Sequence, residues 1–361
     1  MNKIEEMIKE LCPNGVEWKK LGEICEISTG KGITKKDEVL NGKYPIISGG
    51  ITPMGYYNSF NRNANTITVS RVGANAGYVN FITCNFYLND KCFSVIPIDE
   101  KNGDINVVYL YHYLKYIENN ISELQSEGGV PTINTTKLSS ISIPLPPLPI
   151  QTEIVRILDK FVEQQEQIER LIELRKKQYE YYREEMLKPK EGEKWETKTL
   201  GEIGKISIGK KPNEILDKGT FEYINAGTTC SGYSETYNFE GDTITTPSRG
   251  EGGIGFVGYQ KKRFWCGPLC YAIKTSENNK FIYHYLTLHN KLILDLKCEG
   301  GVPALNRKDL ITIEIQVPPV AVQEKIVHTL DSFETSITTL TTALELSKKR
   351  YEYYRDKMMR F

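Results

Sequence analysis

The strongest constraint on this chain is a long helical stretch that occurs twice. Gln151 to Lys188 contains LRKKQYEYYREEMLK, and Gln323 to Phe361 contains LSKKRYEYYRDKMMR. A constant shift of 172 positions superposes the two stretches. The positions that then pair are apolar or aromatic: Ile154 with Ile326, Leu158 with Leu330, Phe161 with Phe333, Ile168 with Leu340, Ile172 with Leu344, Tyr179 with Tyr351 and Tyr182 with Tyr354.

The paired positions recur at seven-residue intervals. One row begins at Ile154, and a second begins four positions later at Leu158. Two adjacent rows form the apolar stripe of a helix that packs along another helix. At about 1.5 Å per residue, each helix would be roughly 50 to 55 Å long and could not bury its stripe on itself. We therefore predict two long helices packed on each other, with a core helix of a globular domain as the alternative.

Charge is balanced along the whole chain. Lys plus Arg and Asp plus Glu each total 46. Residues 18–149 carry 12 basic and 11 acidic side chains, and residues 190–319 carry 17 and 16. A free-standing nucleic-acid-binding domain is usually visibly basic, so this balance argues against strong DNA binding by the chain alone. The sequence has no signal-peptide pattern and no run as long as a membrane span, so we expect a cytoplasmic protein with no membrane partner.

The eight cysteines are scattered rather than paired at metal-ligand spacing. Cys266 and Cys270 are the closest two, and neither a second cysteine pair nor a histidine completes a tetrahedral set near them in sequence. We therefore predict reduced thiols and no metal site.

The region before each long helix has the pattern of a mixed α/β domain with short strands. Glycine and asparagine turns separate the candidate strands of the first region. These candidate strands are Glu23 to Ser28, Tyr44 to Ser48, Thr66 to Ser70, Tyr78 to Ile82 and Cys92 to Ile96. A helix is predicted over residues 107–124, where apolar residues recur at three-and-four spacing. A proline run then ends regular structure before the long helix.

The second region repeats the order of the first. YLYHYL at Tyr109 returns as FIYHYL at Phe281. EGGVP at Glu127 returns at Glu299, and a proline pair follows in each case. Between these landmarks, nearly every polar side chain differs. The order of the landmarks is therefore duplicated, whereas the polar side chains between them are not.

The first residues of the chain match the end of the first long helix. EEMIK at Glu5 parallels EEMLK at Glu184, and LGEI at Leu21 parallels LGEI at Leu200, both at a shift of 179. We therefore predict a quasi-circular, pseudo-two-fold repeat in which the N-terminal segment packs near the C-terminal helix. The predicted division is an N-terminal segment 1–17, a first domain 18–149, a central helix 150–188, a second domain 189–319 and a C-terminal helix 320–361.

The sequence offers little support for catalysis. GEGGIG at Gly250 to Gly255 matches the glycine spacing of a dinucleotide-binding motif. That motif requires a helix after the glycines, whereas the following FVGYQKKRFW is typical of a strand. We predict a glycine-rich hairpin there. The chain has no phosphate loop, no zinc-protease or serine-hydrolase motif, and no Asn/Asp-Pro-Pro-aromatic tetrapeptide of amino-methyltransferases. We therefore expect that the protein is not an enzyme.

Polar loops in the two variable regions hold the candidate DNA-binding residues. Arginine can bond guanine bidentately, and asparagine can do so with adenine. Lysines near them would contact phosphate. An ordinary surface role is the alternative for each residue. The candidates are Ser70, Arg71, Asn75, Thr132, Asn134, Thr135 and Lys137 in the first region, and Ser248, Arg249, Lys261, Lys262, Arg263, Asn306, Arg307 and Lys308 in the second.

The YEYYR ends of the long helices are candidates for contact with a partner protein. Tyrosines can stack on nucleic-acid bases, but their place on amphipathic helices favours helix packing or a protein interface. The basic side chains beside them are either a solvated face or contacts to phosphate. The partner-binding candidates are Tyr179, Tyr182, Arg183, Tyr351, Tyr354 and Arg355.

Together these landmarks resemble the specificity subunit of type I restriction-modification systems. The likeness covers essentially the whole chain: LGE-I at the start of each variable region, EGGVP-x-x-N, the proline-rich exit, a Q-x-E/K-I-V helix opening and the KK-x-YEYYR helix end, each present twice. The resemblance implies an α+β fold in which two mixed α/β target-recognition domains are separated by two long antiparallel coiled-coil helices. It also implies that each domain reads one half of a split DNA site.

The resemblance further implies the partners of a non-catalytic subunit. These are double-stranded DNA, two methyltransferase subunits that modify adenine, and endonuclease/translocase subunits. S-adenosylmethionine would then belong to the methyltransferase, and ATP and Mg to the endonuclease, with no cofactor in this chain. Two alternatives stay open: a DNA-specificity subunit paired with a fused nuclease-methyltransferase, and a non-DNA coiled-coil scaffold protein.

Overall fold

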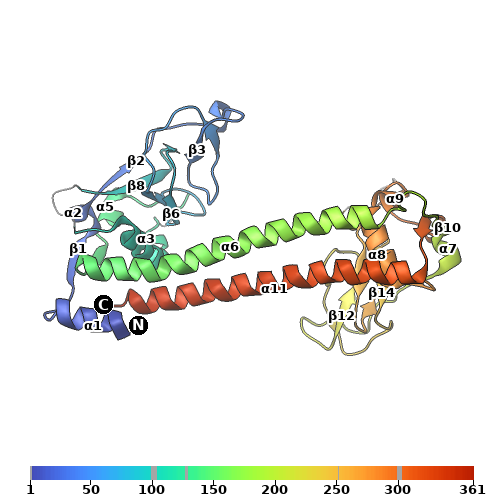
Figure 1. Ribbon diagram of the computed structural model, residues 1–361. Helices are drawn as coiled ribbons and strands as arrows, with labels where there is room; N and C mark the ends of the chain where they lie inside the picture. Colours follow the sequence, from blue (N-terminus) through green and yellow to red (C-terminus); the bar gives the residue numbers. More distant parts are fainter. Residues whose placement is uncertain (1, 99–103, 127–128, 251, 299–302) are drawn as a thin grey trace. The chain divides into compact units, whose positions relative to one another are not determined.

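The computed structural model describes residues 2–98, 104–126, 129–250, 252–298 and 303–361 (Figure 1). The chain forms two compact units. Unit 1 is Met1–Glu169 with Ala343–Phe361, and unit 2 is Arg170–Thr342. Each unit holds a strand-rich mixed domain and segments of two long helices, so the predicted α+β fold class is confirmed. The predicted domain boundaries stay predictions, because this division instead cuts through both long helices.

The two long helices have the same length and the same start. Helix α6 spans Leu148–Met186 and α11 spans Val320–Met358, 39 residues each. Each begins directly after a proline pair. Proline is tolerated there because the first amides of a helix have no partner within the helix. The predicted helices are therefore confirmed: α6 begins two residues before the predicted position 150, and α11 begins at the predicted position 320.

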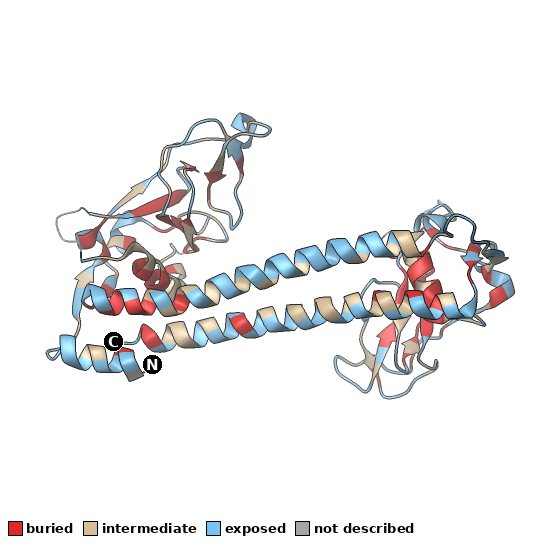
Figure 2. Ribbon diagram, viewed as in Figure 1, coloured by how far each residue is buried: buried red, intermediate tan, exposed pale blue. Residues whose placement is uncertain are grey.

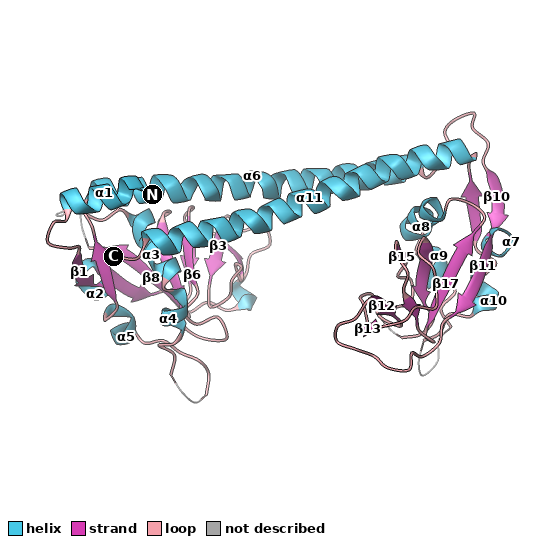
Figure 3. Cartoon of the chain, turned by 90° about the horizontal axis from the view of Figure 1, so that it is seen from below, coloured by secondary structure: helices cyan, strands magenta, loops and turns pink. Residues whose placement is uncertain are grey.

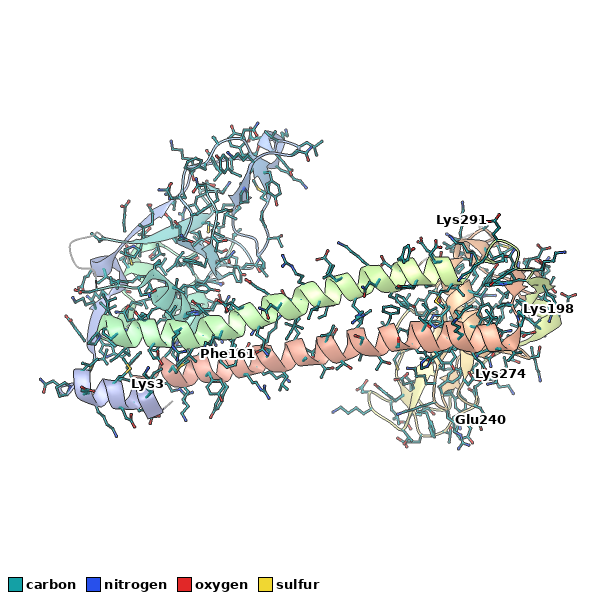
Figure 4. All side chains as sticks on the ribbon, in the orientation of Figure 1. Lys3, Phe161, Lys198, Glu240, Lys274 and Lys291 are labelled. Atoms are coloured by element: carbon teal, nitrogen blue, oxygen red, sulfur yellow. The ribbon has the colours of Figure 1, made fainter. Side chains whose placement is uncertain are left out.

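The helices pack antiparallel within each unit. In unit 1, Phe161 stacks on Tyr354 at 5.3 Å between ring centroids, and Glu169 pairs with Lys348. Phe161 can be followed in Figure 4. In unit 2, Tyr182 stacks on Phe333, also at 5.3 Å. The paired residue numbers rise along α6 and fall along α11 in unit 1, which is the mark of antiparallel packing.

Burial on the long helices concentrates where a domain covers them (Figure 2). Ile154 and Leu158 are buried on α6, and Ile326 and Leu330 are buried on α11. Ile168 on α6 is only partly buried. The apolar stripe of each helix therefore packs into a domain core at its buried end and packs against the other long helix elsewhere.

The domain of unit 1 contains three small sheets. The four-stranded sheet has the order β2–β8–β5–β6, all antiparallel, and the three-stranded sheet has the order β4–β3–β7, with β3 and β7 parallel. Strand β1 pairs with β9. The strands are β1 Glu17–Lys20, β2 Cys25–Thr29, β3 Tyr44–Ile47, β4 Gly55–Tyr57, β5 Thr66–Ser70, β6 Val79–Ile82, β7 Tyr87–Leu88, β8 Cys92–Pro97 and β9 Ser142–Leu145. Strands were predicted near β2, β3, β5, β6 and β8, whereas β1, β4 and β7 were not.

The domain of unit 2 repeats this topology. Its sheets have the orders β11–β17–β14–β15, β13–β12–β16 and β10–β18. Figure 3 shows the strands of this domain in magenta. The strands are β10 Glu196–Thr199, β11 Gly204–Ile208, β12 Phe221–Ile224, β13 Tyr233–Ser234, β14 Thr243–Pro247, β15 Gly258–Gln260, β16 Trp265–Cys266, β17 Cys270–Thr275 and β18 Glu314–Val317. The duplicated frame that the sequence landmarks predict is therefore present strand by strand.

Short helices complete both domains. In unit 1 these are α1 Asn2–Leu11, α2 Leu21–Ile24, a 3₁₀ turn at Lys35–Asp37, α3 Val107–Tyr116, α4 Glu118–Ser122 and α5 Thr135–Ser139. In unit 2 they are α7 Leu200–Ile203, α8 Asn279–Leu288, α9 Lys291–Leu294 and α10 Arg307–Leu310. The single helix predicted over 107–124 is wrong, because Ile117 leaves the helical conformation at ψ 15° before the poor helix formers Asn119 and Asn120.

The core of each domain joins its sheet to the long helices. In unit 1, Leu110 and Leu114 of α3 lie in one buried cluster with Ile67 of β5 and Leu158 of α6. In unit 2, Phe281 and Leu286 of α8 cluster in the same way with Ile244 of β14 and Leu330 of α11.

Helix α1 contributes to the core of unit 1. Its Ile4 lies in the buried cluster that also holds Met358 and Met359 from the end of α11. Lys3, visible in Figure 4, pairs with Glu153 of α6 at 3.2 Å.

Candidate nucleic-acid interface

The end of β5 meets a second loop in unit 1. Ile133 N–H donates to the Arg71 carbonyl at 2.9 Å, and Gly73 N–H donates to the Pro131 carbonyl at 2.9 Å. Val72 and Thr132 form an isolated β-bridge. The structure therefore brings the two predicted polar loops of the first domain together.

Several side chains at this end are already engaged within the domain. Ser70 is 2% exposed, so its hydroxyl offers no surface to a base. The half-buried Arg71 lies 5.8 Å from the centroid of the Phe93 ring, and its Nη1 donates to the Asp90 carbonyl at 3.3 Å. Asn75 donates to the Gly49 carbonyl at 3.4 Å.

The loop after Pro131 presents its polar groups more openly. Asn134 caps α5, because its side-chain oxygen accepts from the Lys137 N–H at 2.8 Å. The side chains of Asn134, Thr135 and Lys137 are exposed. Lys137 Nζ donates to the Leu124 carbonyl at 3.1 Å, and the half-buried Thr132 bonds its hydroxyl to the Val130 carbonyl at 3.0 Å.

The corresponding end of unit 2 has the same backbone frame. Leu305 N–H donates to the Ser248 carbonyl at 2.9 Å, and Arg249 bridges with Ala304. These loops border a hollow of about 300 Å³, lined by Ile208, Ser248, Arg249, Pro268, Leu269, Tyr271, Ala304, Leu305 and Asn306. Arg249 is exposed and forms no ion pair within the described ranges.

The hollow is held by buried polar groups. Tyr271 donates its hydroxyl to the Leu305 carbonyl at 3.0 Å. Burial raises the pKa of Tyr271, so the hydroxyl stays protonated and remains a donor. Ser248 is itself buried. Asn306 donates to Asp309 at 2.9 Å just before α10, which carries the exposed Arg307 and Lys308.

Lys261, Lys262 and Arg263 lie at the opposite end of β14. Gln260, directly before them, pairs with residues at the start of β14, whereas Arg249 follows its end. At about 3.3 Å per residue, β14 separates the two groups by roughly 17 Å. The structure therefore does not bring this basic turn to the Arg249 hollow.

The basic turn borders a larger hollow of about 830 Å³. Its wall includes Tyr233 and Tyr259 as well as all three basic residues. Arg263 is engaged there, because its Nε bonds Glu240 at 2.8 Å and its guanidinium lies 4.7 Å from the Tyr237 ring centroid. Lys261 and Lys262 are exposed. The glycine-rich hairpin predicted just before this turn is followed by strand β15 as expected, although Glu251 within it lies outside the described residues.

The candidate partner-binding residues of the long helices are largely occupied within their own units. In unit 1, Tyr351 bonds His112 at 2.9 Å between the hydroxyl and Nδ1, and Tyr354 stacks on Phe161. Arg355 lies over Tyr351 and pairs with Asp356.

The same residues of unit 2 are occupied in a parallel way. Tyr179 contacts His284 and Glu334 through its hydroxyl, at 3.4 and 3.3 Å. Tyr182 stacks on Phe333 although it is 42% exposed, and Arg183 lies 5.2 Å from the Tyr179 ring centroid. The helix-packing interpretation of these tyrosines therefore has direct support, and their role in partner binding stays a prediction.

A different pair of tyrosines is open to solvent. Tyr181 and Tyr353 are each 60% exposed, and they are equivalent at the shift of 172. Leu174 and Leu346, seven positions earlier in each helix, are also exposed. None of these four residues was predicted to bind a partner, although they occur at the same seven-residue spacing as the buried stripe.

All eight cysteines are free thiols. Across the described ranges, no group of three or more His, Cys, Asp or Glu side chains is placed to hold a metal ion. None of the helices described is long and apolar enough to cross a membrane. The EGGVP repeats lie partly outside the described residues, which lack 127–128 and 299–302.

Two related strand-rich domains with different polar loops, each built onto long helices, define a modular recognition protein. A model of the type I restriction modification DNA specificity domain matches residues 13–176 and again residues 192–347. The chain belongs to this family.

Curated relatives and solved structures agree with this assignment. The chain is 29% identical to the specificity subunit of the Escherichia coli type I restriction enzyme EcoR124I/EcoR124II, over 96% of this chain and 94% of that protein. It is 27% identical to a candidate type I specificity subunit of Mycoplasma pneumoniae, over 95% and 97%. The crystal structure of a type I restriction-modification S subunit from M. genitalium shares the fold with a TM-score of 0.73 at 24% identity, covering 96% and 97% of the two chains.

Proposed function

We propose that each unit of this specificity subunit reads one half of a bipartite, asymmetric DNA sequence. One observation carries the proposal: the same backbone pairing, between the end of a central strand and a second loop, holds different side chains in the two units. A common frame aligns both domains on DNA in the same manner, whereas different side chains contact different bases.

Arg249 is the base-reading residue that we propose for unit 2. Its side chain is exposed beside a hollow of about 300 Å³ and forms no ion pair within the described ranges. An arginine that is free in this way can present two N–H groups to the O6 and N7 atoms of guanine. The neighbouring amide of Asn306 already donates to Asp309, so we assign it to shaping the loop.

In unit 1 the proposed contacts come from both loops. Arg71 must give up its bond to the Asp90 carbonyl before it can bond a base bidentately. Asn134 uses its oxygen as a helix cap. The exposed Thr135 needs no such change, and Lys137 gives the Leu124 carbonyl only one of its ammonium N–H groups, so we assign both residues to contacts with sugar and phosphate. The two half-sites therefore differ in their bases and in the rearrangement that binding requires.

Phosphate contacts in unit 2 fall on two basic groups. Arg307 and Lys308 project from α10 beside the Arg249 hollow, and Lys261 and Lys262 project from the other end of β14. Because each domain would neutralise only a few phosphates with its basic side chains, its affinity for DNA should be modest and should fall as the salt concentration rises. This fits a neutral chain that binds DNA together with basic partner surfaces.

The long helices are the proposed docking element for two methyltransferase subunits, with endonuclease/translocase subunits joining for cleavage in the cytoplasm. Tyr179, Tyr182, Arg183, Tyr351, Tyr354 and Arg355 stay candidates, but their intramolecular contacts make the exposed pairs Leu174 with Tyr181 and Leu346 with Tyr353 the better first contacts. S-adenosylmethionine, ATP and Mg would act in these partners. The same apolar pattern on both helices suits two copies of one partner.

The test is to sequence modified bases in a host that carries this chain with its methyltransferase partner. We expect methylated adenine at a bipartite motif, and loss of that modification when the chain is deleted. A partner that copurifies as a fused nuclease-methyltransferase would change the system but not the role of this chain. Sequence-selective retention of DNA by the assembled complex would exclude the alternative of a non-DNA coiled-coil scaffold.

A further inference from the structure

A buried histidine joins three helices in unit 1. His112 of α3 is 1% exposed. Its Nδ1 lies 2.9 Å from the Tyr351 hydroxyl of α11, and its Nε2 lies 3.2 Å from Asp159 Oδ1 of α6. One imidazole therefore contacts both long helices from within the recognition domain.

The chemistry of the three groups fixes the direction of this relay. Burial raises the pKa of Tyr351, so its hydroxyl is protonated and can donate to Nδ1, whereas an ionised Asp159 carboxylate can only accept at Nε2. The proton of a neutral imidazole then lies on Nε2, where it donates to the Asp159 carboxylate. All three groups are satisfied in this arrangement, and no other tautomer of the neutral ring satisfies both contacts.

Unit 2 contains the same three residue types with the long helices exchanged. His284 of α8 faces Tyr179 of α6 and Asp331 of α11, and all three match their unit 1 counterparts at the shift of 172. The contacts are longer, 3.4 Å to the tyrosine hydroxyl and 3.6 Å to the carboxylate. Burial lowers the pKa of His284 to about 4, so this ring is neutral at neutral pH.

A buried lysine explains the looser contacts in unit 2. Lys280 Nζ lies 2.5 Å from Asp331 and 3.3 Å from Glu334, and its side chain is only 9% exposed. Val108 occupies the equivalent position in unit 1. In unit 2 the Asp331 carboxylate therefore pairs with Lys280 and lies farther from His284, whereas in unit 1 the equivalent Asp159 carboxylate pairs with His112.

Helix α3 connects this histidine to strand β6, which pairs with the strand that precedes Arg71. Lys115 of α3 donates to the Val79 carbonyl of β6 at 3.2 Å, and Val79 N–H donates to Glu118 at 2.8 Å. Strand β6 pairs directly with β5, and Arg71 follows β5. Gln151 of α6 holds the start of α3, because its Oε1 accepts from the Asn106 N–H at 2.8 Å and its Nε2 donates to the Asp104 carbonyl at 2.6 Å. The apolar contacts of α3 lack direction, so the hydrogen bonds of His112 fix the angle of α3 about this first anchor.

We propose that His112 is a positioning residue for DNA recognition: it fixes the recognition domain of unit 1 at one angle on α6 and α11, and His284 with Lys280 does the same for unit 2. This inference rests on the proposed function, because it assumes that each domain reads its own half-site. Neither histidine touches DNA in this proposal.

The experiment uses the complex of this chain with its methyltransferase partner. Tyr351→Phe removes one hydroxyl from the relay and keeps the ring. Methylation rates are measured on the target and on targets with one mismatch in either half. We expect about a fivefold loss of discrimination in the half read by unit 1 and no change in the other half, as is typical of losing one buried hydrogen bond. Tyr116→Phe is the matched control, since this tyrosine also packs at the edge of the unit 1 core.

Further variants separate positioning from stability. Tyr179→Phe should affect only the other half, and less strongly, because its hydroxyl lies farther from the imidazole. His112→Gln keeps an N–H that can reach Asp159 and should retain more discrimination than His112→Leu at equal thermal stability. Nitrogen-15 shifts of His112 should show an unprotonated Nδ1.

Three results would overturn the inference: equal losses in both halves, unchanged discrimination in Tyr351→Phe, or an Nδ1-protonated ring. Failure of the proposed function would look different, because the unmodified complex would then show no bipartite methylation at all.

Discussion

The ends of β5 in unit 1 and β14 in unit 2 occupy the same place in the fold but hold their arginines differently. Arg71 lies over Phe93 and bonds a backbone carbonyl, whereas Arg249 is exposed beside a hollow. The helix junctions differ in the same manner, with a hydroxyl–imidazole relay in unit 1 and a buried lysine in unit 2. Backbone pairing and apolar packing were thus preserved through the duplication, while polar side chains diverged.

The largest expected effect comes from breaking the shared frame. Leu158→Ala in unit 1 and Leu330→Ala in unit 2 each remove a fully buried side chain at equivalent positions. Each should lower the free energy of unfolding by about 3 kcal/mol, through lost burial and a residual cavity. Chemical denaturation measures the loss, and hydrogen exchange should locate it in the unit that carries the substitution.

Leu40→Ala is the matched control for that pair. Leu40 is 90% exposed, so its substitution should change the stability by no more than about 0.5 kcal/mol. If either core variant weakened both units equally, the two units could not be separate cooperative cores.

The arginines test the comparison at the DNA surface. Arg249→Ala should weaken discrimination at one base position by about 2 kcal/mol, or roughly thirtyfold. Arg71→Ala should cost less, because this arginine must first leave its internal contacts. Competition binding of the assembled complex to single-base variants of the target measures both. A larger loss for Arg71 would show that its internal contacts preorganise the side chain.

The buried lysine provides a smaller, salt-sensitive difference. Lys280→Met leaves Asp331 and Glu334 without their shared cation. Both carboxylates are about a third exposed, so the cost should be about 1 to 2 kcal/mol rather than that of a fully buried pair. Thermal unfolding is measured at low and high salt. The difference in melting temperature between Lys280→Met and the unmodified protein should be smaller at high salt. Val108→Met supplies the matched change in unit 1 and should show no salt dependence.

The smallest expected effect is on the stability of unit 1 at low pH. Hydrogen bonds from Arg156, and then from Lys3, lower the pKa of Glu153 to about 2. A carboxylate with a lowered pKa contributes stability above its unfolded pKa, near 4.5, and loses that contribution as the pH falls toward 2. Glu153→Gln should therefore make the free energy of unfolding of unit 1 depend less on pH between about 4.5 and about 2. Unit 2 has Lys325 at the equivalent position and should not respond.

The sequence predicted the features that repeat locally. Both long helices follow from the seven-residue rows that begin at Ile154, because this spacing reports which face is packed. Strand β5 at Thr66–Ser70 was predicted with its observed bounds. Strand β3 was predicted, but the two-residue strand β7 and its parallel pairing with β3 carry no comparable signal, because Tyr87 and Ile46 are paired across 41 positions.

The candidate site was predictable in part for the same reason. The loops that hold Arg71 and Thr132 share glycine and polar turn residues, which mark them as surface loops. Nothing local predicts that Ser70 is buried or that Tyr351 bonds His112, because both facts depend on partners distant in sequence. The exposed Tyr181 was hidden beside the packed Tyr182 in the same YEYYR motif.

Exchange of residues 30–140 for the equivalent segment of another specificity subunit is the most direct test of modular recognition. The methylated motif of the exchanged protein should be sequenced beside that of the original. We predict that one half of the bipartite motif changes completely, while the other half stays as it was. Changes in both halves, or in neither, would contradict the conclusion that each unit reads its own half-site.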